Sequence, residues 1–252
     1  MKTIAFHLQK GGVGKTSLSV SVAVELAAKG RTVLLDVDPQ GNASSWLLTA
    51  APRYELAAVL YGRATLAEAV TATGVPGLDI VPTFGIGGEL KTYGENQLAN
   101  EPFIFCDLVE ELARLGYAFA VFDLSPGMGR QERAAIISAD EIITPMTPEA
   151  FSLDGLEIFA DELNKAKKAM RRGPEHRRII VNAYNETIGQ HNEILAKAEA
   201  KLKGYALHVA PVDPAYRKAQ AANIPIQSLK GKDAPKPSTL STLAAIAGAV
   251  CH

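Results

Sequence analysis

Two lysines, Lys10 and Lys15, lie in one glycine-rich stretch, KGGVGKT, that follows a short apolar segment and opens a helix-like one. Glycines let backbone N–H groups turn onto phosphate oxygens, and the positive end of the following helix adds to that attraction. Lys15, at the start of the helix, would reach the β- and γ-phosphates, and the Thr16 hydroxyl would bind Mg²⁺. The predicted phosphate-binding loop consists of Lys10, Gly11, Gly12, Val13, Gly14, Lys15, Thr16 and Ser17.

Three aspartates stand where apolar segments end. Asp36 and Asp38 close TVLLDVD, and Asp123 closes the apolar part of YAFAVFDLSP. Carboxylates there could hold a metal near the phosphates and orient a water in line with the terminal phosphorus. The simpler interpretation of a lone aspartate after a strand is a turn or capping residue. Asp36 and Asp38 can both face the site only if the strand has ended and begun to turn.

Short apolar segments alternate with helical ones along the chain. We expect strands at 2–8, 32–38, 78–83, 117–126, 141–148, 177–185 and 206–212, and helices at 14–30, 103–116, 152–170, 188–202 and 238–250. This alternation predicts an α/β fold with a mostly parallel, twisted sheet and helices on both faces. The sequence has no internal repeat, so we expect a single domain over residues 1–252, with 85–101 and 230–238 as its most flexible segments.

The composition fits a globular protein with a sizeable core. Apolar residues make up 47% of the 252 residues, and no apolar run is long enough to span a membrane. The two cysteines, Cys106 and Cys251, form neither a disulfide framework nor a zinc pattern. The N-terminus has no secretion signal. We therefore expect a cytoplasmic protein.

Charge is distributed unevenly although the net charge is only −1. Residues 1–164 hold 11 Lys and Arg against 21 Asp and Glu, whereas residues 165–236 hold 15 against 6. Such asymmetry favours a basic face that meets a polyanion. The alternative is a set of solvated helix faces, which are often rich in lysine.

The glycine-rich stretch departs from the general pattern G-x-x-x-x-G-K-[ST], because Gln9 stands where the first glycine belongs. KGGVGKT instead resembles the deviant Walker A motif of the ParA/MinD family of P-loop ATPases, whose hallmark is an additional lysine before the glycines. LLDVDPQGNAS (34–44), AVFDLSPGMG (120–129) and ADEIITPMTPEAFSLDGL (139–156) resemble the family's next motifs in order, and AYRKAQAANIPI (215–226) is a weaker match. The resemblance implies a P-loop ATPase that uses ATP and Mg²⁺, most similar to the ParA-type partition ATPases.

The resemblance also implies roles for individual residues. Asp36 would support the magnesium shell, Asp38 would position or activate the attacking water, and Asp123 would hold a water ligand of Mg²⁺. Asn182 would read the edge of the adenine. Lys10 would cross to the nucleotide of a second subunit, as an arginine finger does, so a homodimer on ATP binding is expected.

The family's two nucleotide-responsive segments can also be placed. Switch I would cover about Pro39–Ser45 and switch II about Ser125–Arg130. After the Walker B aspartate the family often has a threonine and two prolines, whereas this chain has Leu124, Ser125, Pro126 and Gly127. The detail of switch II is therefore left open.

ParA-like proteins bind DNA non-specifically once ATP has joined two subunits, through contacts to phosphates. Arg217 and Lys218 match the position of a DNA-contacting arginine in several relatives. Further candidates, whose alternative is a solvated helix face, are Arg171, Arg172, Arg177, Arg178, Lys197, Lys201 and Lys203. We expect a nucleoid-associated protein with a ParB-like or cargo adaptor as its partner.

Other branches of the family remain as alternatives. A MinD-like protein would end in a basic amphipathic helix that binds membrane, but STLSTLAAIAGAVCH has no lysine or arginine. It is typical of a helix that docks on the core, so no membrane partner is expected. An iron–sulfur branch requires a cysteine pair, and we expect Cys106 to be buried. A metabolic ATPase that activates a carboxylate or amide is the remaining alternative.

Overall fold

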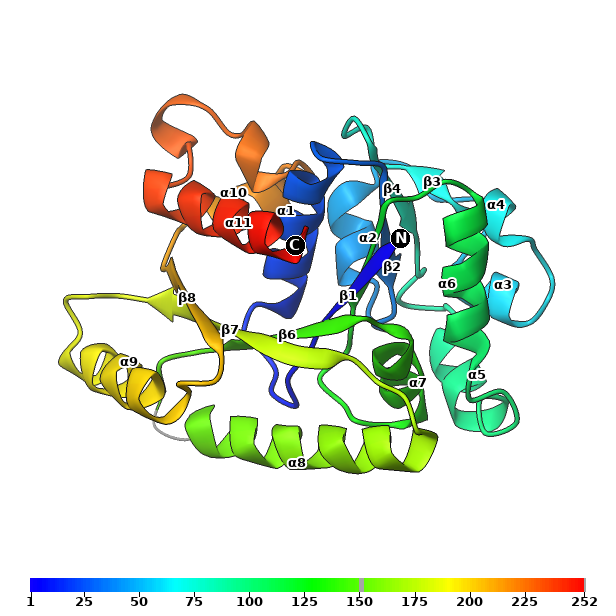
Figure 1. The fold of residues 1–252 in the computed structure, drawn as a ribbon. Helices are drawn as coiled ribbons and strands as arrows, with labels where there is room; N and C mark the ends of the chain where they lie inside the picture. Colours follow the sequence, from blue (N-terminus) through cyan, green and yellow to red (C-terminus); the bar gives the residue numbers. More distant parts are fainter. Residues whose placement is uncertain (150–151, 252) are drawn as a thin grey trace.

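An eight-stranded sheet forms the centre of the protein in the computed structural model, which describes residues 1–149 and 152–251 (Figure 1). The strands are β1 (Lys2–Phe6), β2 (Thr32–Asp36), β3 (Thr71–Ala72), β4 (Leu78–Val81), β5 (Phe119–Asp123), β6 (Glu141–Met146), β7 (Glu175–Tyr184) and β8 (Ala206–Pro211). Their order is β3-β4-β2-β5-β1-β6-β7-β8, and every neighbouring pair is parallel except β3 with β4. The predicted mostly parallel sheet is confirmed.

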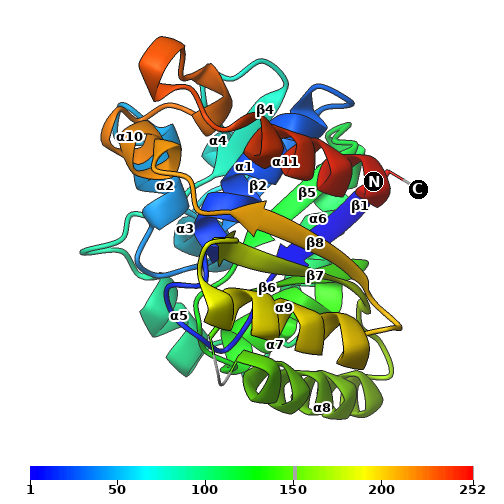
Figure 2. The ribbon, with the colours of Figure 1, turned by 90° about the vertical axis from the view of Figure 1, so that its left-hand side faces the viewer.

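Helices cover both faces of this sheet, as Figure 2 shows with the sheet seen from its β8 side. On one face lie α1 (Lys15–Ala27), α2 (Asn42–Leu47), α10 (Ala215–Ala221) and α11 (Pro237–Val250). On the other face lie α3 (Leu56–Leu60), α4 (Leu66–Ala69), α5 (Leu90–Asn96), α6 (Ile104–Arg114), α7 (Arg130–Ser138), α8 (Ser152–Met170) and α9 (Gly189–Lys201). Two short 3₁₀ turns, Ile226–Ser228 and Gly231–Asp233, join α10 to α11.

The central strands contribute side chains to two separate apolar cores, because successive side chains point to opposite faces of a sheet. In β1, Ile4 and Phe6 pack toward α1 and α11, and Ala5 packs toward the other face. In β2, Leu34 belongs to the first core, and Val33 and Leu35 flank it on the second side. Burial on both faces explains why these strands read as continuous apolar runs in the sequence.

The structure corrects one expectation about mobility. Within 85–101, which was expected to be flexible, α5 is helical and buries Leu90 and Tyr93. Only two side chains of α5 reach the core, and the rest of the helix consists of glycine and polar residues. The sequence therefore shows no helical period of apolar residues here.

The C-terminal helix docks on the core, as expected. In α11, Leu243, Ile246 and Val250 are buried against α1 and β8. Within the described ranges, no helix is both long and apolar enough to cross a membrane. Cys106 is buried in α6.

Candidate phosphate-binding site

The glycine-rich loop connects the end of β1 to the start of α1 at the carboxyl edge of the sheet. Gly12 and Gly14 have φ values of 75° and 90°, a left-handed region that favours glycine. A Cβ on Gly14 would also lie 2.2 Å from the Asn182 amide nitrogen. The loop conformation therefore depends on these glycines, and Gly14, the N-cap of α1, provides no side-chain cap for the first N–H groups of the helix.

Lys15 lies inside the loop. Its Nζ donates to the carbonyl of Lys10 at 2.7 Å and to that of Leu8 at 3.2 Å, and the side chain is buried. Burial lowers the pKa of Lys15, and the carboxylates of Asp123 and Asp38 oppose that shift. The ammonium thus sits in a low-dielectric site near two carboxylates, ready to exchange carbonyl partners for phosphate oxygens.

Lys10 points away from the loop. Its Nζ forms an ion pair with the carboxylate of Glu149 and lies 3.5 Å from the Thr147 hydroxyl. The Lys10 side chain is 39% exposed. The two lysines that share one motif therefore occupy different environments, one internal and one at the surface.

Two of the predicted aspartates meet at the carboxyl ends of neighbouring strands. Asp36 of β2 and Asp123 of β5 are paired in register, and both are fully buried. Asp36 accepts hydrogen bonds from the backbone N–H of Ser44 at 2.8 Å and from its hydroxyl at 2.7 Å. Asp36 therefore holds the first turn of α2, within predicted switch I.

Burial strongly raises the pKa of both carboxyl groups, and the charge of Asp123 raises that of Asp36 further. The nearby hydroxyls of Thr16 and Ser19 oppose the rise in the pKa of Asp123 without forming hydrogen bonds to its oxygens. Two adjacent buried carboxylates are costly unless a cation or a proton compensates them.

Asp123 requires a cation or a proton to compensate its buried charge. Among the described residues, neither of its oxygens has a hydrogen-bond partner. A buried carboxylate beside the Thr16 hydroxyl has the oxygen donors that Mg²⁺ prefers. No cluster of three or more His, Cys, Asp or Glu side chains suited to a metal occurs in residues 1–149 and 152–251. Asp123 and Thr16 together fit a magnesium ion whose remaining ligands would be phosphate and water oxygens.

A cavity of about 760 Å³ opens in front of the loop. Its lining includes the loop residues Gly11, Gly12, Gly14, Lys15, Thr16 and Ser17. Asp38 also faces it and accepts a hydrogen bond from the Gln40 N–H at 2.9 Å. Asp38, unlike Asp36, thus reaches the space where a phosphate would lie, because β2 ends at Asp36 and the chain turns.

Three lining residues were not predicted from the sequence: Trp46, Gln220 and Asn223. The Trp46 indole N–H donates to the Ile224 carbonyl at 2.8 Å, and the Asn223 amide donates to the Ser45 carbonyl at 2.8 Å. These bonds tie α2 to the end of α10. Nothing local in the sequence signals this pairing, because the partners are 178 residues apart.

Asn182 follows the buried part of β7, and its amide donates to the Val13 carbonyl at 2.9 Å. Val13 belongs to the loop, and its side chain is buried. Asn182 therefore braces the loop. Its expected contact with adenine stays a prediction.

Predicted switch II leads into α7, which contacts Val37, two residues before predicted switch I. The Gly129 N–H donates to the Glu132 carboxylate at 2.8 Å, and the Ser125 hydroxyl donates to the same group. The Gln131 amide donates to the Val37 carbonyl at 2.6 Å. Movement of predicted switch II would therefore be transmitted through α7 to Val37, which leads into predicted switch I.

The basic candidates divide between the two edges of the sheet. Arg217 and Lys218 lie on α10, which begins after β8 at the edge that carries the loop; Arg217 is exposed, and Lys218 pairs with Asp233. The end of α8, the start of β7 and the second half of α9 lie at the opposite edge. These carry Arg171, Arg172, Arg177, Arg178, Lys197, Lys201 and Lys203.

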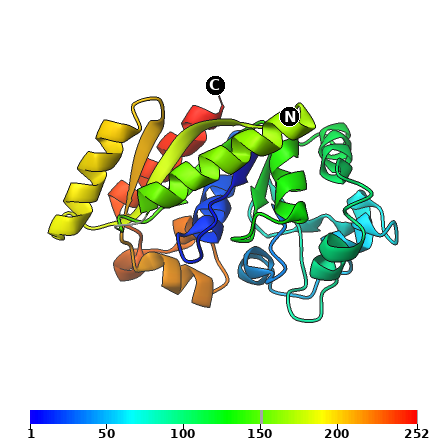
Figure 3. The same cartoon turned by 90° about the horizontal axis from the view of Figure 1, so that it is seen from below.

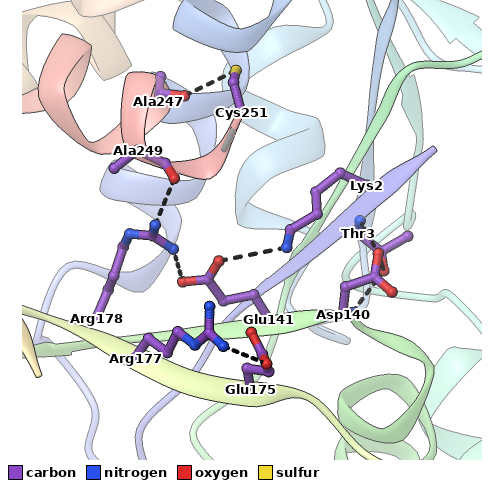
Figure 4. Close-up of polar contacts among 10 residues, drawn as sticks. All are labelled: Lys2, Thr3, Asp140, Glu141, Glu175, Arg177, Arg178, Ala247, Ala249 and Cys251. Atoms are coloured by element: carbon purple, nitrogen blue, oxygen red, sulfur yellow. Dashed lines mark hydrogen bonds and ion pairs between the residues drawn. The ribbon is translucent and has the colours of Figure 1, made fainter. Parts of the chain in front are cut away.

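Arg178 is engaged within the protein rather than free for DNA (Figure 4). Its guanidinium pairs with buried Glu141 and donates to the Ala249 carbonyl at the end of α11, and only 14% of its side chain is exposed. Arg177 beside it pairs with Glu175. The expectation that Arg178 contacts DNA is therefore wrong, because a charge that compensates a buried carboxylate cannot leave without a large penalty.

Known proteins are similar in sequence to this chain. A family model described as an AAA domain matches residues 1–173. An uncharacterized protein of Borreliella burgdorferi, BBD21, is 34% identical over 222 residues, covering 87% of this chain and 89% of the relative. The chromosome partitioning protein ParA of Caulobacter vibrioides is 30% identical over 191 residues, covering 73% of this chain and 70% of the relative.

The fold also has close counterparts. The septum site-determining protein MinD of Pyrococcus horikoshii, solved with Mg-ADP, matches with a TM-score of 0.80 at 23% identity, covering 99% of this chain and 95% of the other. With the glycine loop, the strand-end aspartates and these relatives in agreement, the chain belongs to the ParA/MinD family of P-loop ATPases.

Proposed function

We propose that this protein is a ParA-type ATPase that works as an ATP-dependent sandwich dimer. The dimer binds DNA without sequence preference and thereby segregates or positions a plasmid, a chromosome or another cargo. A partner on the cargo stimulates hydrolysis, and the subunits then separate. Membership of a family that includes the Caulobacter chromosome partitioning protein supports a positioning role.

The observation that carries the proposal is the separation of the two loop lysines. Lys15 is folded over its own loop, whereas the Lys10 ammonium lies at the surface beside Glu149. Lys10 has no part in its own loop's cavity lining. A cation at this rim is suited to the phosphates of a nucleotide held by a second copy, where it stabilises developing charge as an arginine finger does.

The loop of one copy would bind the phosphates of ATP through its backbone N–H groups and the Lys15 ammonium. The Thr16 hydroxyl and Asp123 would hold Mg²⁺, which when bound neutralises negative charge on the phosphates. The MinD structure with Mg-ADP supports this cofactor pair for the family. Asp38 faces the same cavity and would orient the attacking water, while Asp36 keeps α2 in place through Ser44.

DNA binding would follow from α10. Arg217 is exposed at the nucleotide edge, while Gln220 and Asn223 at the other end of this helix region line the nucleotide cavity. A cation in this place would contact DNA phosphates, which carry no sequence information. Nucleotide binding could therefore alter the position of Arg217 through a single short helix.

The membrane alternative receives no support from α11. A membrane-binding helix leaves its apolar stripe free for lipid. Here Leu243, Ile246 and Val250 are buried in the core, and the Ala249 carbonyl is held by Arg178.

A DNA titration in three nucleotide states tests the proposal. Labelled DNA of random sequence is titrated with the full chain in Mg-ATP, in Mg-ADP and without nucleotide, with fluorescence anisotropy as the readout. We expect tight binding only with Mg-ATP, together with a dimer in light scattering. Equal binding in all three states would refute the switch. Lys15→Ala is the control, because it removes nucleotide binding but leaves α10 unchanged.

A further inference from the structure

A second groove lies on the other side of the loop, between α7, α8 and the segment 98–102 that joins α5 to α6. Its volume is about 840 Å³, larger than that of the nucleotide cavity. Figure 3, seen from below, shows α7 beside the C-terminal half of α8, with α5 and α6 beyond it. One end of the groove reaches Gln9 and Met128. Gln9 directly precedes Lys10, and Met128 belongs to predicted switch II. The groove is thus separate from the phosphate site but contacts predicted switch II and the residue before Lys10.

Both helices present a regular stripe to this groove. The stripe on α7 consists of Arg130, Arg133, Ala134 and Ile137. The stripe on α8 consists of Glu162, Lys165, Ala166, Ala169 and Met170. Spacings of three and four residues mark one face of a helix over about two turns. A surface made of two such stripes is a groove of the kind that accepts a third, amphipathic helix.

The charges at the rim of the groove are mostly positive. Arg130, Arg133 and Lys165 are exposed, and none of them forms an ion pair within residues 1–149 and 152–251. The one carboxylate in the lining, Glu162, already accepts a hydrogen bond from the Gln9 amide at 2.7 Å. Three unpaired cations therefore surround a floor of alanine and other apolar side chains, and an acidic occupant would complement them.

We propose that this groove binds an acidic amphipathic helix of a partner protein. Leucine-like side chains at helical spacing would pack on Ala134, Ala166 and Ala169, whose small size allows a close approach, and carboxylates would pair with Arg133 and Lys165. The inference rests on the proposed function in one respect. A helix seated here contacts Gln9 and switch II, so it is placed to change how the nucleotide is held.

A selection experiment tests the groove directly. A library of random helical peptides of about 15 residues is displayed and selected on the immobilised full chain in Mg-ATP. Each recovered peptide is then titrated by anisotropy against the wild type, Lys165→Glu, Ala166→Trp and Lys168→Glu. Lys168 is exposed on α8 but lies outside the groove lining, so it is the matched control for charge reversal.

We expect the recovered peptides to be acidic and amphipathic, and to bind about tenfold more weakly to Lys165→Glu and to Ala166→Trp than to Lys168→Glu. Failure to recover any peptide, recovery of basic peptides, or equal binding to all variants would overturn the proposal. Loss of self-association in Lys165→Glu would also overturn it, because a second copy of this chain would then be the occupant.

Failure of this inference is distinguishable from failure of the proposed function. Nucleotide binding is measured in the same samples through the emission of Trp46, which lines the phosphate cavity. A protein that binds Mg-ATP and DNA but no acidic peptide would refute the groove alone.

Discussion

Replacing Lys10 with alanine should abolish ATP hydrolysis while leaving the fold and nucleotide binding almost unchanged. Within residues 1–149 and 152–251, the Lys10 ammonium makes its polar contacts with Glu149 and Thr147. Its removal takes nothing from the interior of the loop, which Lys15 occupies. The effect on catalysis would come from the second subunit's nucleotide, where the charge would be missing.

The two magnitudes differ greatly. The lost ion pair has side chains that are 39% and 60% exposed, and pairs this open contribute less than about 1 kcal/mol to folding. A cation supplied across an interface to the transferred phosphate accelerates hydrolysis by on the order of 10³-fold or more. We therefore expect Lys10→Ala to keep its melting temperature within a few degrees but to lose nearly all turnover.

Glu149→Ala provides the matched control, because it removes the same ion pair from the other side. This variant frees Lys10 and should dimerise with ATP at least as readily as the wild type. Nucleotide affinity, mass by light scattering and phosphate release are measured for Lys10→Ala, Lys15→Ala and Glu149→Ala. The reasoning fails if Lys10→Ala and Lys15→Ala have identical defects, or if Glu149→Ala loses hydrolysis as completely as Lys10→Ala.

Four further predictions concern charge and the single tryptophan. Asp123→Asn should raise the Tm of the protein without nucleotide at neutral pH and flatten the fall of Tm as the pH rises from 3.8 to about 7, because folding raises the pKa of the Asp123 carboxyl from 3.8 to about 7 and the stability that this shift contributes is lost as the group ionises; scanning fluorimetry at several pH values checks this. Arg217→Glu should weaken Mg-ATP-dependent DNA binding at least about tenfold in anisotropy. Arg178→Ala should leave DNA binding intact but lower the free energy of unfolding in urea by about 3 kcal/mol, since Glu141 stays buried. Mg-ATP should change Trp46 emission, and Trp46→Phe should remove that signal and, with the bond to Ile224, about 1 kcal/mol of stability.

Local sequence signals predict the regular elements of the fold because its strands and longer helices are buried in a periodic way. The helix expected at 152–170 is α8 with the same bounds. The short helices α2, α3, α4, α7 and α10 were not predicted, since each presents too few apolar side chains for a period to be visible. The antiparallel strand β3 has two residues, which is too short for an alternation of apolar and polar residues to be recognised.

The residues of the candidate site also include some that the sequence predicts and some that it does not. Residues that sit on a local motif, such as Lys15 and Asp38, could be identified because their spacing follows from the loop and the strand end. Trp46 and Asn223 could not, since their roles depend on hydrogen bonds to residues 178 positions away. Arg178 was misjudged because a basic residue in the sequence does not reveal the buried carboxylate, Glu141, that lies on a neighbouring strand.

The hydrogen bonds between α2 and the end of α10 have a thermodynamic consequence. If ATP shifts α2 and DNA contacts α10, the two ligands are coupled, and linkage makes the coupling reciprocal. Whatever factor ATP adds to the affinity for DNA, DNA must add to the affinity for ATP. Copies bound to DNA would then bind ATP more tightly than free copies. Trp46 and Asn223 would thus set a difference in nucleotide occupancy between DNA-bound and free protein.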